Sequence, residues 1–349
     1  MSCCPDLTPD SQLLGPQPLG RRDVLRAAGP AALAAPFVAG RARAAVGKRL
    51  QIGFCSQFLC APPYLAAKSG DFFKAEGLDV EIVYLRGSPA VVQALAGGAL
   101  DYGACTFEDV VLALSRGVAL TRFLSTAKLP LFALAVAPAK AAQITDARAL
   151  EGRTVGIVSP GSVHEGWTRT LMRQAGADPA KVRFAALGPN IYDPLRLGQV
   201  DTAWVGEPAL SLLKRQGAGV IVNFMETADA DRVFGGRYEF MGMAVRAKEA
   251  DARRDEMAAI GRAMNRGLAA LQEVAPETAV KALPAPLLAG LDVALLADIL
   301  TRYRAALYPV TGAIDVAACQ RVADALLALG LIPAGLDWKH VLDLSVVPA

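Results

Sequence analysis

The chain has little excess charge of either sign. Its 349 residues contain 36 Lys and Arg against 33 Asp and Glu, which gives a formal net charge of +3 at pH 7. No run of basic residues forms a polybasic patch, so the sequence argues against a nucleic-acid partner. No internal apolar stretch reaches the roughly 18 uncharged residues of a membrane-spanning helix, and we therefore expect none.

Histidine and cysteine are also scarce. The sequence has 2 His and 6 Cys, and the cysteines lack the paired C-x-x-C spacing of a structural zinc site. We therefore expect no metal site and no cofactor. What is abundant is hydrophobic residues, at 53%, together with 32 Gly and 22 Pro. This composition is typical of a well-filled α/β protein, and the length suffices for two ordinary domains or one bilobal domain.

Residues 1–44 are expected to be a signal peptide. An arginine pair at 21–22 precedes a mildly apolar, Ala- and Gly-rich run over 27–40, and residues 42–44 match an A-x-A cleavage pattern. The arginine pair resembles a twin-arginine signal, and an ordinary Sec signal is the alternative. Cleavage near Ala44 would make the mature protein periplasmic.

The rest of the chain alternates apolar, partly β-branched runs with helical segments. Short strands separated by single helices imply βαβ units, a mostly parallel sheet and right-handed crossovers. The predicted strands are 50–55, 79–84 and 100–105 in the first half, and 154–159, 182–187, 200–205 and 219–224 in the second.

One short phrase occurs twice in the sequence. Leu95, Gly98 and Asp101 recur, with the same spacing, as Leu195, Gly198 and Asp201. We interpret each copy as a strand–loop–helix unit whose loop follows the carboxyl end of a strand, where ligands bind in open α/β sheets. The repeat then predicts two lobes, each of which contributes loops to one cleft.

Several linked phrases resemble those of the NMT1/THI5-like and SsuA-like solute-binding proteins of ABC importers. The resemblance extends over roughly Leu50 to Phe224, with a looser helical part after it. The matching positions are Tyr64, Phe73, Glu76, Gly77, Leu78 and Val80 in one phrase, Ala94–Asp101 in a second, and Gly206–Pro208 in a third.

This resemblance implies a type II periplasmic-binding-protein fold, in which two α/β lobes close on a ligand by a hinge motion. Lobe 1 would comprise residues 45–136 and 239–349, and lobe 2 residues 137–238. The chain would cross between them at 131–138 and 238–247. The C-terminal helices would pack on lobe 1.

The implied function is that of an extracytoplasmic solute-binding component of an ABC importer, a monomer that partners a membrane permease and ATPase. The solute would be small: a sulfonate, taurine, nitrate, a carboxylate or a pyrimidine. The chain would not be an enzyme. Thiamin-pyrimidine synthases share the fold but rely on a cysteine-rich iron cluster and a reactive histidine in the lobe-1 loops, which have no counterpart here. A periplasmic sensor that partners a membrane kinase is a further alternative with the same fold.

Candidate ligand residues follow the predicted strands. Several have a structural alternative: Ser88 and Thr106 are good helix N-caps, and Glu207 precedes a helix that it could cap. His164 and Trp204 could equally be interior residues. The candidates are Ser56, Gln57, Ser88, Thr106 and Glu108 in lobe 1, and Ser159, Gly161, Ser162, His164, Asn190, Tyr192, Trp204 and Glu207 in lobe 2.

The charge of the ligand stays open. A helix amino end at 160–162 would suit an anionic group, since its free N–H groups and dipole favour negative charge. Glu108 and Glu207 would instead suit a ligand with hydrogen-bond donors.

The resemblance also bears on two cysteines. In type II binding proteins the first and third strands of lobe 1 are adjacent, which would bring Cys55 and Cys105 close together in an oxidising compartment. They would either form a disulfide, with Cys60 as a competing partner, or remain free thiols packed beneath the loops.

Overall fold

A computed structural model describes residues 49–347, apart from residues 56, 189 and 289. The predicted signal peptide lies outside the described residues. The described residues make up one compact unit. Among the described residues, none of the helices is long and apolar enough to cross a membrane.

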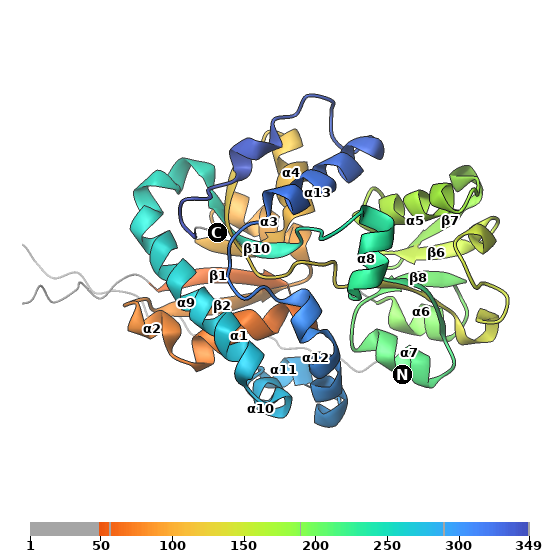
Figure 1. The fold of residues 1–349 in the computed structure, drawn as a ribbon, viewed down its shortest axis with the longest axis horizontal. Coiled ribbons are helices and arrows are strands. Elements are labelled where there is room, and N and C mark those ends of the chain that lie inside the picture. The colour runs from red at the N-terminus through yellow and green to blue at the C-terminus, as the bar shows by residue number, and fades with distance from the viewer. Residues whose placement is uncertain (1–48, 56, 189, 289, 348–349) are drawn as a thin grey trace, which may run out of the picture. The chain divides into compact units, whose positions relative to one another are not determined.

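Two five-stranded sheets organise this unit, one in each lobe (Figure 1). The lobe-1 sheet has the strand order β2-β1-β3-β10-β4, and the lobe-2 sheet has the order β7-β6-β8-β5-β9. The strands of lobe 1 are β1 (Leu50–Cys55), β2 (Val80–Leu85), β3 (Tyr102–Thr106), β4 (Leu120–Ser125) and β10 (Met241–Arg246). Those of lobe 2 are β5 (Ala133–Val136), β6 (Thr154–Ile157), β7 (Arg183–Ala186), β8 (Thr202–Val205) and β9 (Gly219–Asn223).

Each sheet is parallel in only one part. β1 pairs in parallel with β2 and β3, and β6 pairs in parallel with β7 and β8. β10 and β5 are antiparallel to both of their neighbours, because each enters its sheet from the opposite lobe. The prediction of a mostly parallel sheet therefore missed these two strands.

The helices lie around these sheets. In lobe 1 they are α1 (Ala61–Ser69), α2 (Phe72–Ala75), α3 (Ser88–Ala96) and α4 (Phe107–Ser115). In lobe 2 they are α5 (Val163–Gln174), α6 (Tyr192–Arg196), α7 (Ala209–Arg215) and α8 (Thr227–Phe234). The C-terminal helices are α9 (Arg254–Glu273), α10 (Pro276–Lys281), α11 (Ala285–Leu288), α12 (Val293–Leu307) and α13 (Val316–Ala328). Short 3-10 helices occupy Phe58–Cys60, Pro138–Lys140, Arg148–Leu150, Pro179–Lys181, Ala247–Glu249, Asp251–Arg253 and Trp338–Val341.

The chain connects the two sheets through residues 126–132, the first crossover, and residues 235–240, the return crossover. Backbone hydrogen bonds join the two crossovers: Tyr238 N donates to the Lys128 carbonyl, and Phe240 N to the Ala127 carbonyl, each at 3.1 Å. β5 begins at residue 133 and pairs within the lobe-2 sheet, so lobe 2 starts a few residues before the predicted boundary at 136.

A buried ion pair anchors the return crossover to lobe 1. Arg122 of β4 is fully buried, and its Nη2 donates to Glu239 Oε1 at 2.8 Å. The same guanidinium donates to the backbone carbonyls of Cys105 and Phe240. Because a buried charge is stable only when it is paired and hydrogen-bonded, this arrangement fixes the residues around 239.

The repeated phrase lies at the amino ends of the parallel strands, whereas the sequence analysis placed it at their carboxyl ends. Gly98 and Gly198 have positive φ values of 82° and 72°, which glycine adopts without strain, and each ends a helix just before the strand that follows. The loops therefore run from helix to strand, not from strand to helix. They do not contribute to a cleft at the carboxyl ends of the strands.

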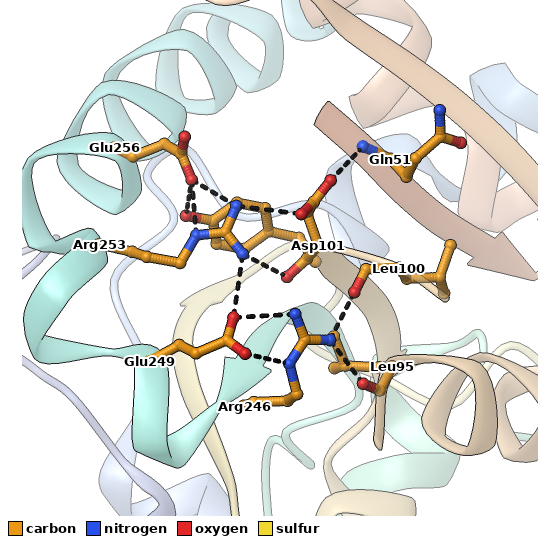
Figure 2. Close-up of polar contacts among 9 residues, drawn as sticks. Gln51, Leu95, Leu100, Asp101, Arg246, Glu249, Arg253 and Glu256 are labelled. Carbon is orange, nitrogen blue, oxygen red and sulfur yellow. Dashed lines mark hydrogen bonds and ion pairs between the residues drawn. The ribbon is translucent and has the colours of Figure 1, made fainter. Parts of the chain in front are cut away.

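The repeated aspartates instead hold the first strand of each parallel group. Asp101 Oδ2 accepts a hydrogen bond from Gln51 N at 2.9 Å, and Asp201 Oδ2 accepts one from Thr154 N at 2.6 Å. Each carboxylate also has a cationic neighbour from another segment. Arg253 lies beside Asp101 in a network with Glu256 (Figure 2), and Lys140 pairs with Asp201.

The C-terminal helices contact both lobes. α9 packs on α1, where a Cβ added at Gly267 would lie 2.7 Å from Ala67 N. α12 reaches lobe 2, where Asn223 Nδ2 donates to the Tyr303 hydroxyl at 3.0 Å. α13 packs against α4 and α5, one from each lobe. The prediction that these helices pack on lobe 1 is therefore incomplete.

The four cysteines among the described residues are free thiols. β1 and β3 are adjacent, as predicted, with Phe54 opposite Ala104, yet Cys55 and Cys105 are not bridged. Cys60 and Cys319 are also free, and all four are buried. They therefore match the alternative in which the thiols pack beneath the loops.

Candidate functional site

Both lobes and both crossovers line one cavity of ≈ 280 Å³, which we call the interlobe cavity. Lobe 1 contributes the end of β1, the amino ends of α3 and α4, and Arg116 just after α4. Lobe 2 contributes the loop between β6 and α5. The polar lining residues are Gln57, Ser88, Thr106, Asp109, Arg116, Ser159, Ser162 and His164.

On the lobe-1 side, three side chains form one hydrogen-bonded group. Thr106 is the N-cap of α4 and accepts from Asp109 N at 3.2 Å. Its hydroxyl donates to Asp109 Oδ2 at 2.9 Å, and Ser88 Oγ accepts from Thr106 N at 2.9 Å. Burial raises the pKa of Asp109, while hydrogen bonds from Ser88 and Thr106 oppose the rise. This wall of the cavity thus offers a carboxyl group in a fixed orientation.

On the lobe-2 side, the loop of residues 159–162 leads into α5. Gly161 has a φ of 69°, and its N–H donates to Glu165 Oε2 at 3.0 Å. Ser162 is the N-cap residue, but its hydroxyl caps no N–H and has no partner among the described residues. A buried hydroxyl without a partner costs free energy. Its place in the cavity wall makes it available to a ligand.

His164 lies in the same wall within an aromatic cluster. Its ring centroid is 4.5 Å from that of Phe132, and the ring stacks on Trp204 at 5.9 Å. Burial lowers the pKa of His164 to about 3, so the imidazole is neutral at physiological pH. Its Nδ1 has no hydrogen-bond partner among the described residues. The cavity therefore contains a neutral ring nitrogen that can exchange a hydrogen bond with a ligand.

The remaining walls are largely apolar. Phe132 of the first crossover and Phe240 of the return crossover meet edge to face, with ring centroids 6.3 Å apart. Leu112, Met241 and two free thiols complete this surface. Among the described lining residues, Arg116 is the one permanently charged basic group, and it is exposed. The interior thus suits a compact molecule with an apolar or aromatic body.

Comparison with known proteins identifies the family. The family model described as NMT1/THI5 like matches residues 60–279. The chain belongs to the NMT1/THI5-like family. No curated protein matches the sequence significantly.

Solved structures similar to this NMT1/THI5-like protein share its fold. A protein from Bordetella bronchiseptica RB50 has 22% identity and a TM-score of 0.73, over 86% of this chain and 96% of that one. The periplasmic aliphatic sulphonate binding protein SsuA from Escherichia coli has 20% identity and a TM-score of 0.62, over 84% and 91%. The periplasmic nitrate-binding protein NrtA from Synechocystis PCC 6803 has 13% identity and a TM-score of 0.66, over 84% of each chain. The fold is therefore that of the periplasmic binding proteins, with two α/β lobes.

Seven of the thirteen predicted site residues line the interlobe cavity of this NMT1/THI5-like protein. They are Gln57, Ser88, Thr106, Ser159, Gly161, Ser162 and His164. Thr106 is also the N-cap of α4, so its capping role is confirmed, and its contact with a ligand stays a prediction. Ser88 is the first residue of α3 and caps no N–H, which leaves its hydroxyl to Thr106. Ser56 lies outside the described residues.

Three predicted residues are interior and do not line the cavity. Trp204 Nε1 donates to Thr168 Oγ1 at 2.9 Å within the aromatic cluster. Glu207 accepts from Ser211 N and Ser211 Oγ, at 3.0 and 2.9 Å, in the first turn of α7. Glu108 is 1% exposed, on α4. Trp204 is thus an interior residue, and Glu207 bonds to the first turn of the helix that follows it, which are the structural alternatives given for them above.

Two more lie on the lobe-2 surface, away from the cavity lining. Asn190 is exposed. The Tyr192 hydroxyl, at the start of α6, accepts from Gln216 Nε2 at 2.9 Å. Their loop follows β7, which is at the edge of its sheet. A loop beyond an edge strand is farther from the centre of the cleft than one beyond a central strand.

Sequence reasoning missed Asp109, Arg116, Phe132 and Phe240. The spacing of Thr106 and Asp109 is that of a capping box, which places the acidic side chain beside the N-cap. That signal was present in the sequence. The two aromatic residues lie in crossovers, which the sequence analysis treated as connections, and it gave no signal for their place in the cavity wall.

Proposed function

We propose that this protein is the extracytoplasmic solute-binding component of an ABC importer and closes its two lobes on a small molecule. The observation that carries this proposal is the interlobe cavity itself, which both lobes and both crossovers line. Membership of the NMT1/THI5-like family and the likeness to solute-binding folds support it. The proposal includes a periplasmic location after cleavage near Ala44, a monomeric state, and a permease and ATPase as partners.

The cavity lining favours an uncharged solute with a flat ring, of the pyrimidine type. Phe132 and Phe240 offer aromatic surfaces, and the neutral His164 and the Asp109 carboxyl can exchange hydrogen bonds with ring nitrogens or amino groups. A sulfonate or nitrate would lie near Asp109 without a buried cation among the described lining residues. Such an anion would depend on the amino end of α5 and on Arg116 at the surface.

A thermal-unfolding screen of the full chain tests the proposal. The panel comprises pyrimidines, taurine and other sulfonates, nitrate and aromatic carboxylates. A solute that binds only the native state stabilises it by about 2.7 kcal/mol at a hundred times its Kd, so we expect one class to raise the Tm by several degrees. A rise with sulfonates alone would overturn the ring assignment. No rise with any class, or conversion of a solute to product, would overturn the binding-protein proposal.

His164→Phe tests the role of the open ring nitrogen. Phenylalanine keeps the aromatic packing but has no Nδ1, so the solute-dependent Tm rise should shrink while the unliganded Tm changes little. Tyr192→Phe is the matched control, because Tyr192 does not line the cavity.

Glu207→Ala should have the opposite effect. It should lower the Tm of the unliganded protein, because a hydrogen bond to the first turn of α7 is lost, while the solute-dependent Tm rise persists.

A further inference from the structure

A second cavity, of ≈ 380 Å³, lies beside the two crossovers, and we call it the rear cavity. Its wall includes Lys128 from the first crossover, Arg237 and Glu239 from the return crossover, and Asp315 at the start of α13. Consecutive residues of the return crossover face different cavities: Glu239 lines the rear cavity, and Phe240 lines the interlobe cavity. The two cavities therefore share the crossovers as a common wall.

The rear cavity contains two basic side chains without ion pairs. Among the described residues, neither Lys128 nor Arg237 has a carboxylate within ion-pair distance. Lys128 is half-buried, and its pKa is lowered by desolvation and by the positive charge of Arg237. A third cation is close by, since Arg321 Nη1 donates to the Arg237 carbonyl at 3.2 Å. Two like charges close together, one of them half-buried, favour a counterion.

The acidic residues of this wall already have partners within the protein. Glu239 Oε1 pairs with Arg122 at 2.8 Å, and both side chains are buried. Asp315 Oδ1 accepts from Ala318 N at 3.0 Å as the N-cap of α13. Among the described residues, neither carboxylate forms an ion pair with Lys128 or Arg237.

The wall also holds a buried hydroxyl. Ser125 is 2% exposed, and its Oγ has no well-formed hydrogen bond among the described residues. It lies close enough to Glu239 to lower the pKa of that carboxyl. A hydroxyl that lines a cavity without a well-formed hydrogen bond can donate to a bound oxygen atom.

We propose that the rear cavity is a second binding site, for a small multivalent oxyanion of the phosphate or sulfate type. Lys128 and Arg237 would supply charge-assisted hydrogen bonds, and Ser125 a neutral one. The ion would lie between residues of the two crossovers and would hold them together. This site does not depend on the proposed function, because its contacts are separate from the interlobe cavity.

A consequence for solute binding does rest on the proposed function. If the solute-bound, closed lobes keep the arrangement of the crossovers described here, anion and solute should each tighten the binding of the other by the same factor. The coupling would run through Glu239 and Phe240, neighbours that face the two cavities.

Chemical modification of the full chain with an amine-reactive acetylating reagent, with and without inorganic phosphate, tests the site. At ten times the phosphate Kd, acetylation of Lys128 should slow about tenfold, since only the free fraction reacts. Sodium chloride at equal ionic strength controls for screening, and exposed Lys68 is the internal control. The readout is the acetylated fraction of each peptide by mass spectrometry. Equal rates for Lys128 in phosphate and in chloride would overturn the proposal.

Two variants give an independent measure. Phosphate should raise the Tm of the wild type above that in chloride, and Lys128→Gln should lose this difference. Arg237→Gln should lose it too, and it alters an exposed side chain that does not threaten folding. Lys68→Gln should keep it. A phosphate effect of wild-type size in both cavity variants would place any bound ion elsewhere. If phosphate protects Lys128 but no solute in the thermal-unfolding screen raises the Tm, the anion site is retained and the proposed function is rejected.

Discussion

At the scale of single residues, Glu108 shows how position on a helix decides the role of a side chain. It lies two residues after Thr106, the last residue of β3, and its side chain is buried on α4. Asp109, the next residue, lines the interlobe cavity. Successive residues of a helix point in directions that differ by about 100°. The sequence could therefore predict that this turn faces the cavity, but not which of its two acidic residues does so.

Burial raises the pKa of Glu108 from 4.5 to about 8. Because the folded-state pKa is the higher one, the folded protein holds an extra proton between these values, and stability falls as the pH rises toward 8. Glu108→Gln carries no titrating group here. We expect the wild type to lose, between pH 5 and pH 8, on the order of 3 kcal/mol more than this variant.

Urea unfolding at pH 5, 6.5 and 8 measures this difference. The comparison cancels the contribution of His164, whose lowered pKa has the opposite effect, because stability then rises with pH up to the unfolded-state value. Glu277→Gln, on the exposed side of α10, should parallel the wild type. Parallel curves for the wild type and Glu108→Gln would show that Glu108 is ionised in the folded protein.

At the scale of elements, the duplicated aspartates give each lobe the same internal support. In lobe 2, burial alone would raise the pKa of Asp201, but hydrogen bonds from Lys140 and Thr154 N outweigh it and lower the pKa. Asp201→Asn should cost about 1.5–3 kcal/mol, the usual range for a hydrogen bond to a charged group. Asp193→Asn, whose side chain is 67% exposed, should change stability by less than about 0.5 kcal/mol.

Chemical denaturation of the two variants decides the matter. Because the lost bond is at the amino end of β6, away from the cavity lining, Asp201→Asn should keep its affinity for solute. A free energy of unfolding equal to that of Asp193→Asn would show that the duplicated aspartate does not support the strand.

The sequence predicted seven of the strands to within about two residues at each end, because apolar and β-branched residues predominate in each run. It gave no indication of β4, whose run contains Arg122. A charged residue fits an exposed strand such as β7, where Arg183 is exposed, but argues against a buried strand such as β4. Its burial is possible because partners outside the strand, Glu239 and the carbonyls of Cys105 and Phe240, satisfy the guanidinium. The repeat was detected correctly but was assigned to the wrong end of the strands. The spacing of its residues alone does not say whether a loop precedes or follows a strand.

At the scale of the whole molecule, α12 and α13 connect the C-terminal part to lobe 2. The bond from Asn223 to the Tyr303 hydroxyl, at 3.0 Å, would break if lobe 2 moved away from α12. If the lobes close on a solute as proposed, Tyr303→Phe should weaken solute binding about fivefold, which corresponds to about 1 kcal/mol for one hydrogen bond.

Isothermal titration calorimetry with the solute from the screen measures this change. Tyr84→Phe, in β2 and away from lobe 2, is the control and should bind like the wild type. Equal affinities for both variants would mean that the α12 contact does not contribute to the closed arrangement.

The position of the duplicated aspartates has a consequence for how such a protein can diversify. Asp101 and Asp201 act at the amino ends of the parallel strands, and the residues that line the interlobe cavity lie mostly at the carboxyl ends and in the crossovers. Substitutions in the lining therefore leave the aspartate contacts of both lobes intact. One architecture can thus vary the residues that contact the solute while the same pair of aspartates continues to hold the strands of both lobes.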